Sequence, residues 1–238
     1  MRKITIANEI EINGKVLPIL TSGIGKGCYV EMLTAIEREM TAMLSNHNKV
    51  LMFRIDVHVN NYTDNNTVIS TLLRRYKRWA MEYYDTKRIA HVWCREVETA
   101  KKQHYHLFLM IDGNKVQTTD YLFDKFNDIA LNSNLHAWLP ENPYYRVKKD
   151  DMLAYSEAFK RASYLAKQRG KKIKGERANS YSASRIQPRL ATDSELSKSG
   201  DDYLKRIATK ASSSKSLPHT NNRNRQPLTD AERQLPLF

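Results

Sequence analysis

The spacing of apolar residues changes period several times along this chain, and the order of those changes restricts the fold. Residues 29–44 and 69–83 carry apolar side chains at helical spacing, whereas residues 50–59 alternate for most of their length, as a strand does. Two further extended runs, 89–98 and 104–112, are separated by a short polar stretch. That separation suits an antiparallel hairpin.

Three more elements complete the expected domain, namely a helix over 120–132, a short strand over 144–147 and a helix over 152–168. The resulting order of helices and strands predicts an α+β fold in which helices pack on one face of an antiparallel sheet. The short alternating runs of residues 1–27 are compatible with an added edge strand.

The length of 238 residues fits one domain of about 150 to 190 residues with an appendage. We expect the folded domain over 1–190 and a flexible tail over 191–238. Residues 191–233 have too little apolar content to offset the entropy of ordering, so most of this tail is predicted to be disordered.

Cysteine usage and hydropathy exclude several protein classes. Two cysteines are too few for a disulfide framework, and the residues that follow Met1 do not form the apolar core of a signal peptide. No window approaches the roughly 18 uninterrupted apolar residues of a membrane span. We therefore expect a soluble protein of a reducing, intracellular compartment.

Positive charge is concentrated in one part of the chain. The net charge is +13, and residues 160–177 supply +7 of it, with eight basic residues and one acid. Such a patch favours nucleic acid as the partner through counterion release, although a solvated basic helix end is the simpler alternative. The residues expected to contact DNA are Lys160, Arg161, Lys171, Lys172 and Lys174.

Two histidines are predicted to form a metal site. His104 and His106 project from the same face of a strand because strand side chains alternate. If Glu98 lies opposite His104, then Glu96 lies opposite His106, and a carboxylate completes a site for a catalytic divalent ion. We favour Glu96, because Glu98 is closer to the turn. The alternatives are a surface pair of histidines and a structural zinc site. A structural zinc site would need four protein ligands with no open position.

A second pair alternates in the same manner on strand 50–59. Asp56 and His58 share one face with Arg54, opposite the apolar face. They are secondary candidates for the site. Their simpler interpretation, hydrogen-bonded polar residues on a partly exposed face, is the favoured one.

Tyr164 is the candidate nucleophile. Helical geometry over 152–168 places it half a turn from Tyr155, which belongs to the apolar stripe, and among basic residues. A free phenol with a pKa of about 10 is only about 0.1% ionised at pH 7, so a phenolate nucleophile needs neighbouring cations. Lys167 can supply one. An exposed surface tyrosine is the alternative.

These residues coincide with the motifs of a known family. The segment 103–109 (Gln-His-Tyr-His-Leu-Phe-Leu) resembles the His-hydrophobe-His strand of HUH endonucleases, and 164–167 (Tyr-Leu-Ala-Lys) resembles their Tyr-x-x-Lys nucleophile motif. Segments 92–96, 161–167 and 182–185 resemble the inovirus-type replication initiators of filamentous phages and prophage-like elements. The resemblance extends from about Val50 to Arg185.

The resemblance implies a sheet of about five antiparallel strands with flanking helices, of ferredoxin-like or palm-like type, in a protein of the bacterial cytoplasm. It also implies Mg²⁺ or Mn²⁺ on His104, His106 and Glu96. Tyr164 would attack the scissile phosphate of single-stranded or hairpin DNA at an origin, form a 5′-phosphotyrosyl link and release a 3′-hydroxyl. Tyr105 replaces the usual aliphatic residue. Because Tyr155 faces the core, single-tyrosine chemistry is expected.

The last five residues, Gln-Leu-Pro-Leu-Phe, resemble the peptide by which bacterial replication and repair proteins bind the sliding clamp. The expected anchors are Gln234, Leu235, Leu237 and Phe238. An incidental apolar terminus is the alternative. A host polymerase would use the released 3′-end, and a host helicase is a further candidate partner.

Three functions share these features. The leading expectation is a replication initiator that nicks and rejoins single-stranded DNA at an origin. A relaxase or transposase of the same superfamily would use the same site. A DNA-binding regulator without nuclease activity would use the basic residues only to bind phosphates.

Overall fold

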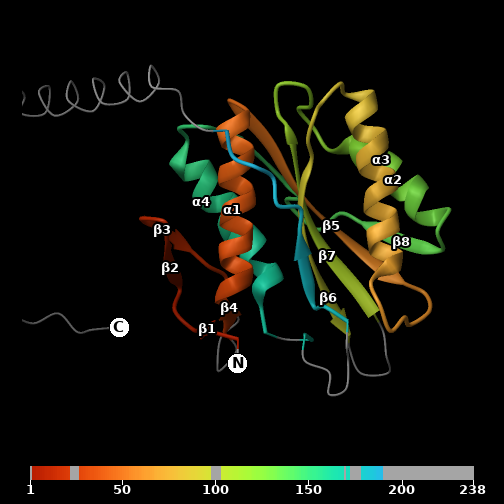
Figure 1. Ribbon diagram of the computed structural model, residues 1–238, viewed down its shortest axis with the longest axis horizontal. Helices are drawn as coiled ribbons and strands as arrows, with labels where there is room; N and C mark the ends of the chain where they lie inside the picture. Colours follow the sequence, from red (N-terminus) through yellow and green to blue (C-terminus); the bar gives the residue numbers. More distant parts are fainter. Residues whose placement is uncertain (1, 22–26, 98–102, 169, 172–177, 190–238) are drawn as a thin grey trace, which may run out of the picture. The chain divides into compact units, whose positions relative to one another are not determined.

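A computed structural model gives the fold of this chain (Figure 1). The chain divides into two units, and all of the described residues lie in the first, Met1–Leu190. The structure describes residues 2–21, 27–97, 103–168, 170–171 and 178–189. The predicted tail over 191–238 lies outside them.

Four α-helices are present in the described part of the chain, which confirms the helices expected from apolar spacing. They are α1 (Val30–Asn46), α2 (Thr67–Tyr83), α3 (Asp120–Leu131) and α4 (Met152–Ala162). A 3₁₀ turn, η2 (Ser163–Ala166), continues α4, so the expected α-helix over 152–168 is shorter than predicted.

The central sheet is antiparallel and has six strands in the described residues, which confirms the α+β class and adds one strand to the expected number. Its order is β10 (Tyr181–Ala183), β6 (Ala90–Val97), β7 (Gln103–Asp112), β5 (Lys49–Val59) and β8 (Leu135–Trp138). A further strand, β9 (Tyr144–Lys148), pairs with the first half of β5, while β8 pairs with its second half. Strands β8 and β10 are too short for their apolar residues to show a clear period in the sequence.

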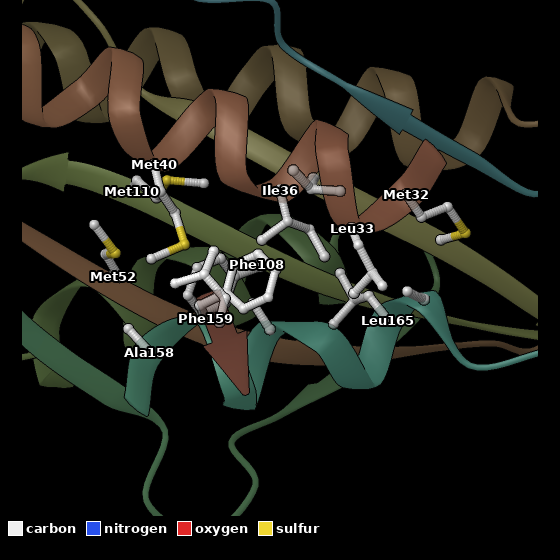
Figure 2. Packing of buried hydrophobic residues seen from close by; sticks show 14 of the residues in the cluster. Met32, Leu33, Ile36, Met40, Met52, Phe108, Met110, Ala158, Phe159 and Leu165 are labelled. Carbon is white, nitrogen blue, oxygen red and sulfur yellow. The ribbon is translucent and has the colours of Figure 1, made fainter. Parts of the chain in front are cut away.

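Helices cover both faces of the sheet, which corrects the expectation of helices on one face. Helices α1 and α4 pack on one side, and α2 and α3 pack on the other (Figure 1). The reason lies in the first half of β5, where Val50 and Met52 are buried under α1 and α4 while Leu51 and Phe53 are buried on the opposite side. Figure 2 shows the first of these cores, with Phe108 of β7 between α1 and α4.

The described residues of the N-terminal segment, 2–21 and 27–29, do not extend the central sheet. They form a hairpin of β2 (Glu9–Ile12) and β3 (Lys15–Pro18), and a short pair of β1 (Ile4–Thr5) with β4 (Cys28–Tyr29). The predicted edge strand is therefore a separate hairpin.

Buried Glu37 of α1 fixes this hairpin in place. It accepts hydrogen bonds from Lys15 Nζ at 2.7 Å and Asn13 Nδ2 at 2.9 Å. Burial would raise the pKa of Glu37, but the hydrogen bonds and the charge of Lys15 lower it overall.

No helix in the described residues is long and apolar enough to cross a membrane.

Candidate metal centre and nucleophile

The pairing of three strands brings polar side chains to one place. His104 lies between Glu96 of β6 and His58 of β5, and His106 lies between Cys94 and Asp56. Even-numbered positions share a face, as expected. The register differs, because Glu96 rather than Glu98 is opposite His104.

The reason for the shifted register is Gln103, which was assigned to the turn but begins β7. Its side chain is buried, donates to the Tyr105 hydroxyl at 2.9 Å and accepts from the Thr63 backbone N–H at 2.9 Å. These contacts move the connection one residue toward the N-terminus. Glu98 lies outside the described residues.

Glu96, His104 and His106 form a buried group that could hold a metal ion. One carboxylate oxygen, Glu96 Oε2, lies 3.5 Å from His104 Nε2 and 3.4 Å from His106 Nε2. The ligand atoms all lie within 4.8 Å of one another. His106 Nε2 is buried and has no hydrogen-bond partner among the described residues, so a cation between these atoms would satisfy it. Two imidazoles and one carboxylate fit a divalent ion that retains open positions.

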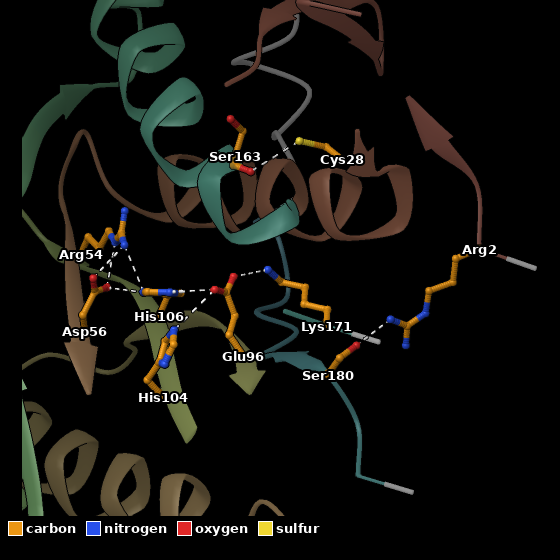
Figure 3. A network of polar contacts seen from close by, with 10 residues as sticks. All are labelled: Arg2, Cys28, Arg54, Asp56, Glu96, His104, His106, Ser163, Lys171 and Ser180. Carbon is orange, nitrogen blue, oxygen red and sulfur yellow. Dashed lines mark hydrogen bonds and ion pairs between the residues drawn. The ribbon is translucent and has the colours of Figure 1, made fainter. Parts of the chain in front are cut away.

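The second carboxylate of the site, Asp56, orients His106 from behind (Figure 3). Asp56 Oδ1 lies 2.8 Å from His106 Nδ1, which requires the proton on that nitrogen and leaves Nε2 directed at Glu96. Burial would raise the pKa of Asp56, but hydrogen bonds from His106 and Arg54 lower it overall. Burial would lower the pKa of His106, but its contacts with the two carboxylates raise it overall.

Buried Arg54 binds both oxygens of Asp56, with Nε at 2.8 Å and Nη2 at 2.7 Å. Its Nη2 also lies 3.0 Å from His106 Nδ1. A guanidinium only donates hydrogen bonds, so it competes with the Nδ1 proton there, and the bidentate contact with Asp56 is the one that persists. Residue types in an alternating strand suggested Asp56 as a secondary candidate, whereas no sequence signal distinguished Arg54 from a surface arginine.

Lys171 lies inside the site. It was expected on a DNA-binding surface, but it is buried and its Nζ lies 2.5 Å from Glu96 Oε1. Gly170, with φ of +73°, makes this approach feasible, because a Cβ there would lie 3.2 Å from the Glu96 Cβ. Burial would raise the pKa of Glu96, but its contacts with both histidines and the charge of Lys171 lower it well below its usual range.

Tyr164 contacts His106 and does not lie on an exposed basic face of a helix. Its ring meets the His106 ring edge-on, with 5.2 Å between centroids. The Arg54 Cζ is 4.0 Å and the Lys167 Nζ 4.4 Å from the centre of the tyrosine ring. The structure thus brings Tyr164 and Lys167 together with the Glu96, His104 and His106 group.

The remaining predicted site residues have different positions. Lys160 and Arg161 are half-buried on α4, and Arg161 donates to the backbone carbonyl of Glu141. His58 is exposed, and its ring packs edge-on against Trp138 at 4.3 Å. The other predicted DNA and clamp contacts, Lys172, Lys174, Gln234, Leu235, Leu237 and Phe238, lie outside the described residues.

Comparison with known proteins places the chain in a family. No curated protein and no solved structure matches this chain. A family model, that of the YagK/YfjJ C-terminal domain, matches residues 19–182, which include every strand of the central sheet except the last residue of β10 as well as all four helices. The chain therefore belongs to the YagK/YfjJ C-terminal domain family.

Proposed function

We propose that this domain is an HUH-type endonuclease that nicks and rejoins single-stranded DNA at an origin of replication. The observation that carries the proposal is the contact between the Tyr164 ring and His106, whose Nε2 belongs to the group that could hold a metal. This contact supports a reaction in which Tyr164 and a metal bound by that group act on the same phosphate. The resemblance to inovirus-type initiators favours replication over transposition or mobilisation.

The chemistry is a phosphoryl transfer to Tyr164. Its hydroxyl oxygen forms a bond to the scissile phosphorus, and the bond from phosphorus to the 3′-oxygen breaks. The phenolic proton passes to solvent, and the leaving oxygen takes up a proton to become a 3′-hydroxyl. The 5′-phosphotyrosyl link keeps the energy of the broken bond, so attack by a 3′-hydroxyl rejoins the strand.

The metal proposed for Glu96, His104 and His106 is Mg²⁺ or Mn²⁺, which would polarise a phosphate oxygen when bound. The chain's own cations have a separate task. Arg54 and Lys167, which lie against the Tyr164 ring, stabilise negative charge that develops on the attacking oxygen and the phosphate. Asp56 keeps His106 in the tautomer that offers Nε2.

Tyr155 supports a single-tyrosine reaction. Its hydroxyl lies in the core, 3.1 Å from Thr41 Oγ1 and 3.3 Å from Glu37 Oε1. Burial raises the pKa of Tyr155 further above that of a free phenol. It therefore cannot serve as a second nucleophile without unfolding of α4.

The test is formation of a covalent adduct. The full chain is incubated with Mn²⁺ and labelled single-stranded DNA from the origin of its own replicon, and the products are separated in denaturing gels. A labelled protein adduct is expected for the wild type and for Tyr155→Phe, and none for Tyr164→Phe. If all three proteins bind the DNA and none forms an adduct, the result supports a DNA-binding regulator and contradicts the proposed nickase.

The C-terminal peptide is proposed to bind the bacterial sliding clamp at the released 3′-end. The support is its sequence, Gln-Leu-Pro-Leu-Phe at 234–238. Deletion of these five residues should abolish clamp binding in a pull-down while leaving adduct formation intact. Equal clamp binding by the truncated chain would remove this part of the proposal.

A further inference from the structure

A basic groove runs along α2 on the face of the sheet opposite the Tyr164 site. It consists of two adjoining hollows of about 550 and 500 Å³, which share Ser70 and Arg74. We name it the α2 groove. Its polar lining includes Thr67, Ser70, Arg74, Lys77, Arg78 and His91, and its apolar lining consists of Leu73, Met81 and Trp93. No carboxylate lines either hollow among the described residues.

The charges of the groove are available to a ligand. Arg74 and Arg78 are exposed, lie one helical turn apart and form no ion pair with any residue in the described ranges. Thr67 and Ser70 line the same hollow as Arg74, and their hydroxyls can donate hydrogen bonds there. Arginine forks together with hydroxyl donors are the side chains that bind phosphate oxygens.

The groove begins at the end of the sheet that carries the site. Asn66, at its start, accepts a hydrogen bond from the Tyr105 hydroxyl at 2.9 Å. Tyr105 stands between His104 and His106 on β7, with its side chain on the opposite face of the sheet. Asn66 also donates to the carbonyl of Asn179, just before edge strand β10. Single-stranded DNA that leaves the Tyr164 site around this edge of the sheet would therefore enter the α2 groove.

We infer that the α2 groove binds the phosphates of the single-stranded DNA segment that flanks the cut. The inference deepens the proposed function, because it names a second contact surface for the same substrate. It also replaces the DNA contact that the sequence predicted for Lys171. That residue is paired with Glu96 inside the site and contributes no exposed charge. Arginines of α2 supply that charge instead.

The first test measures how binding depends on salt. The double variant Arg74→Ser, Arg78→Ser removes two phosphate contacts. The negative slope of log K against log[salt] should therefore become shallower by about 1.4. If the counterion effect vanishes near 1 M salt, the loss of affinity at about 0.1 M salt is about 25-fold. Fluorescence anisotropy with a long oligonucleotide gives both values. Measurement without metal, in a Tyr164→Phe background, makes the result independent of cleavage.

The matched control is Lys49→Ser with Lys148→Ser. These residues are exposed and paired across β5 and β9 at the far end of the sheet, and their loss changes the net charge equally. The control should keep the wild-type slope. If both double variants change the slope equally, binding depends only on net charge and the α2 groove is excluded. If the slope changes more in the control than in the arginine variant, the DNA lies at the other end of the sheet and the inference is again overturned.

The second test locates the DNA directly. Cys28 and Cys94 are buried, and burial raises the pKa of both thiols, that of Cys94 to about 12, so neither should react with a thiol reagent in the folded chain. A cysteine introduced as Ser70→Cys can then be labelled selectively. DNA should slow its labelling at least several-fold, while Lys125→Cys on α3 should label at the same rate with and without DNA. Equal rates at both positions would overturn the inference.

Discussion

Asp56→Asn tests whether the carboxylate behind His106 prepares it for a metal. The substitution keeps the shape of the side chain but removes the negative charge 2.8 Å from His106 Nδ1 that keeps the proton on that nitrogen. Loss of such an orienting contact commonly weakens metal affinity by about 10- to 100-fold. The same change leaves Arg54 buried without its carboxylate partner, so a separate loss of about 3–5 kcal/mol in stability is also expected.

Metal-linked stabilisation separates these two effects. At a Mn²⁺ concentration 100 times the wild-type dissociation constant, bound metal adds about 2.7 kcal/mol to the free energy of unfolding. A 10- to 100-fold weaker site gains only about 0.4–1.4 kcal/mol at the same concentration. Urea denaturation with and without Mn²⁺ gives this difference for each protein, whatever its stability without metal.

Asp112→Asn is the matched control for that experiment. Asp112 also contacts a histidine Nδ1, that of His47 at 3.2 Å, but at the other end of β7. Its loss should leave the Mn²⁺-dependent gain at the wild-type value. An unchanged gain in Asp56→Asn would refute the orienting role, and no gain in the wild type would show that Glu96, His104 and His106 do not bind this metal.

Two further substitutions follow from the same geometry. Gly170→Ala should cost about 1–3 kcal/mol for its positive φ and should also weaken Mn²⁺ binding, because the new methyl group meets Glu96. Gly14→Ala has the same φ of +73° but open space, so urea titration should show only the conformational cost; equal Mn²⁺ affinities in both would contradict the predicted contact. Glu37→Gln should destabilise the fold above about pH 4 and progressively less as pH falls, because its folded pKa lies below the unfolded value. A pH-independent difference in unfolding free energy would rule out the charge of Glu37 as the cause.

The long elements could be predicted from the sequence because their burial is periodic. The boundaries of β5 and α2, for example, lie within two residues of the ranges that their apolar spacing predicted. The hairpin register could not be predicted, since it depends on tertiary contacts of Gln103 that no local pattern shows. The N-terminal hairpin had a readable signal, because Asn13-Gly14 supplies the two positive φ angles of a tight turn.

The environment of Tyr164 differs from the one that the sequence predicted. Helical geometry placed it on a face with basic residues, because 100° per residue was assumed up to Gln168. The chain instead tightens into a 3₁₀ turn after Ala162, which changes the direction of every later side chain. Lys171 was likewise expected on a DNA-binding surface, and its ion pair with Glu96 cannot be read from a charge count.

The tight turn gives Tyr164 its direction through the residues on either side of it. Ser163, Leu165 and Ala166 are all fully buried, and Ser163 Oγ accepts the backbone N–H of Leu20 while donating to the carbonyl of Lys160. With three of its four side chains fixed in the core, the turn can direct the fourth only away from the core. On the side of β5 and β7 that α4 covers, the apolar residues end at Met52 and Phe108 and are followed by Arg54, Asp56 and His106, and the Tyr164 ring meets the histidine ring there. Core packing rather than an attraction between the site residues therefore sets how close Tyr164 lies to the Glu96, His104 and His106 group.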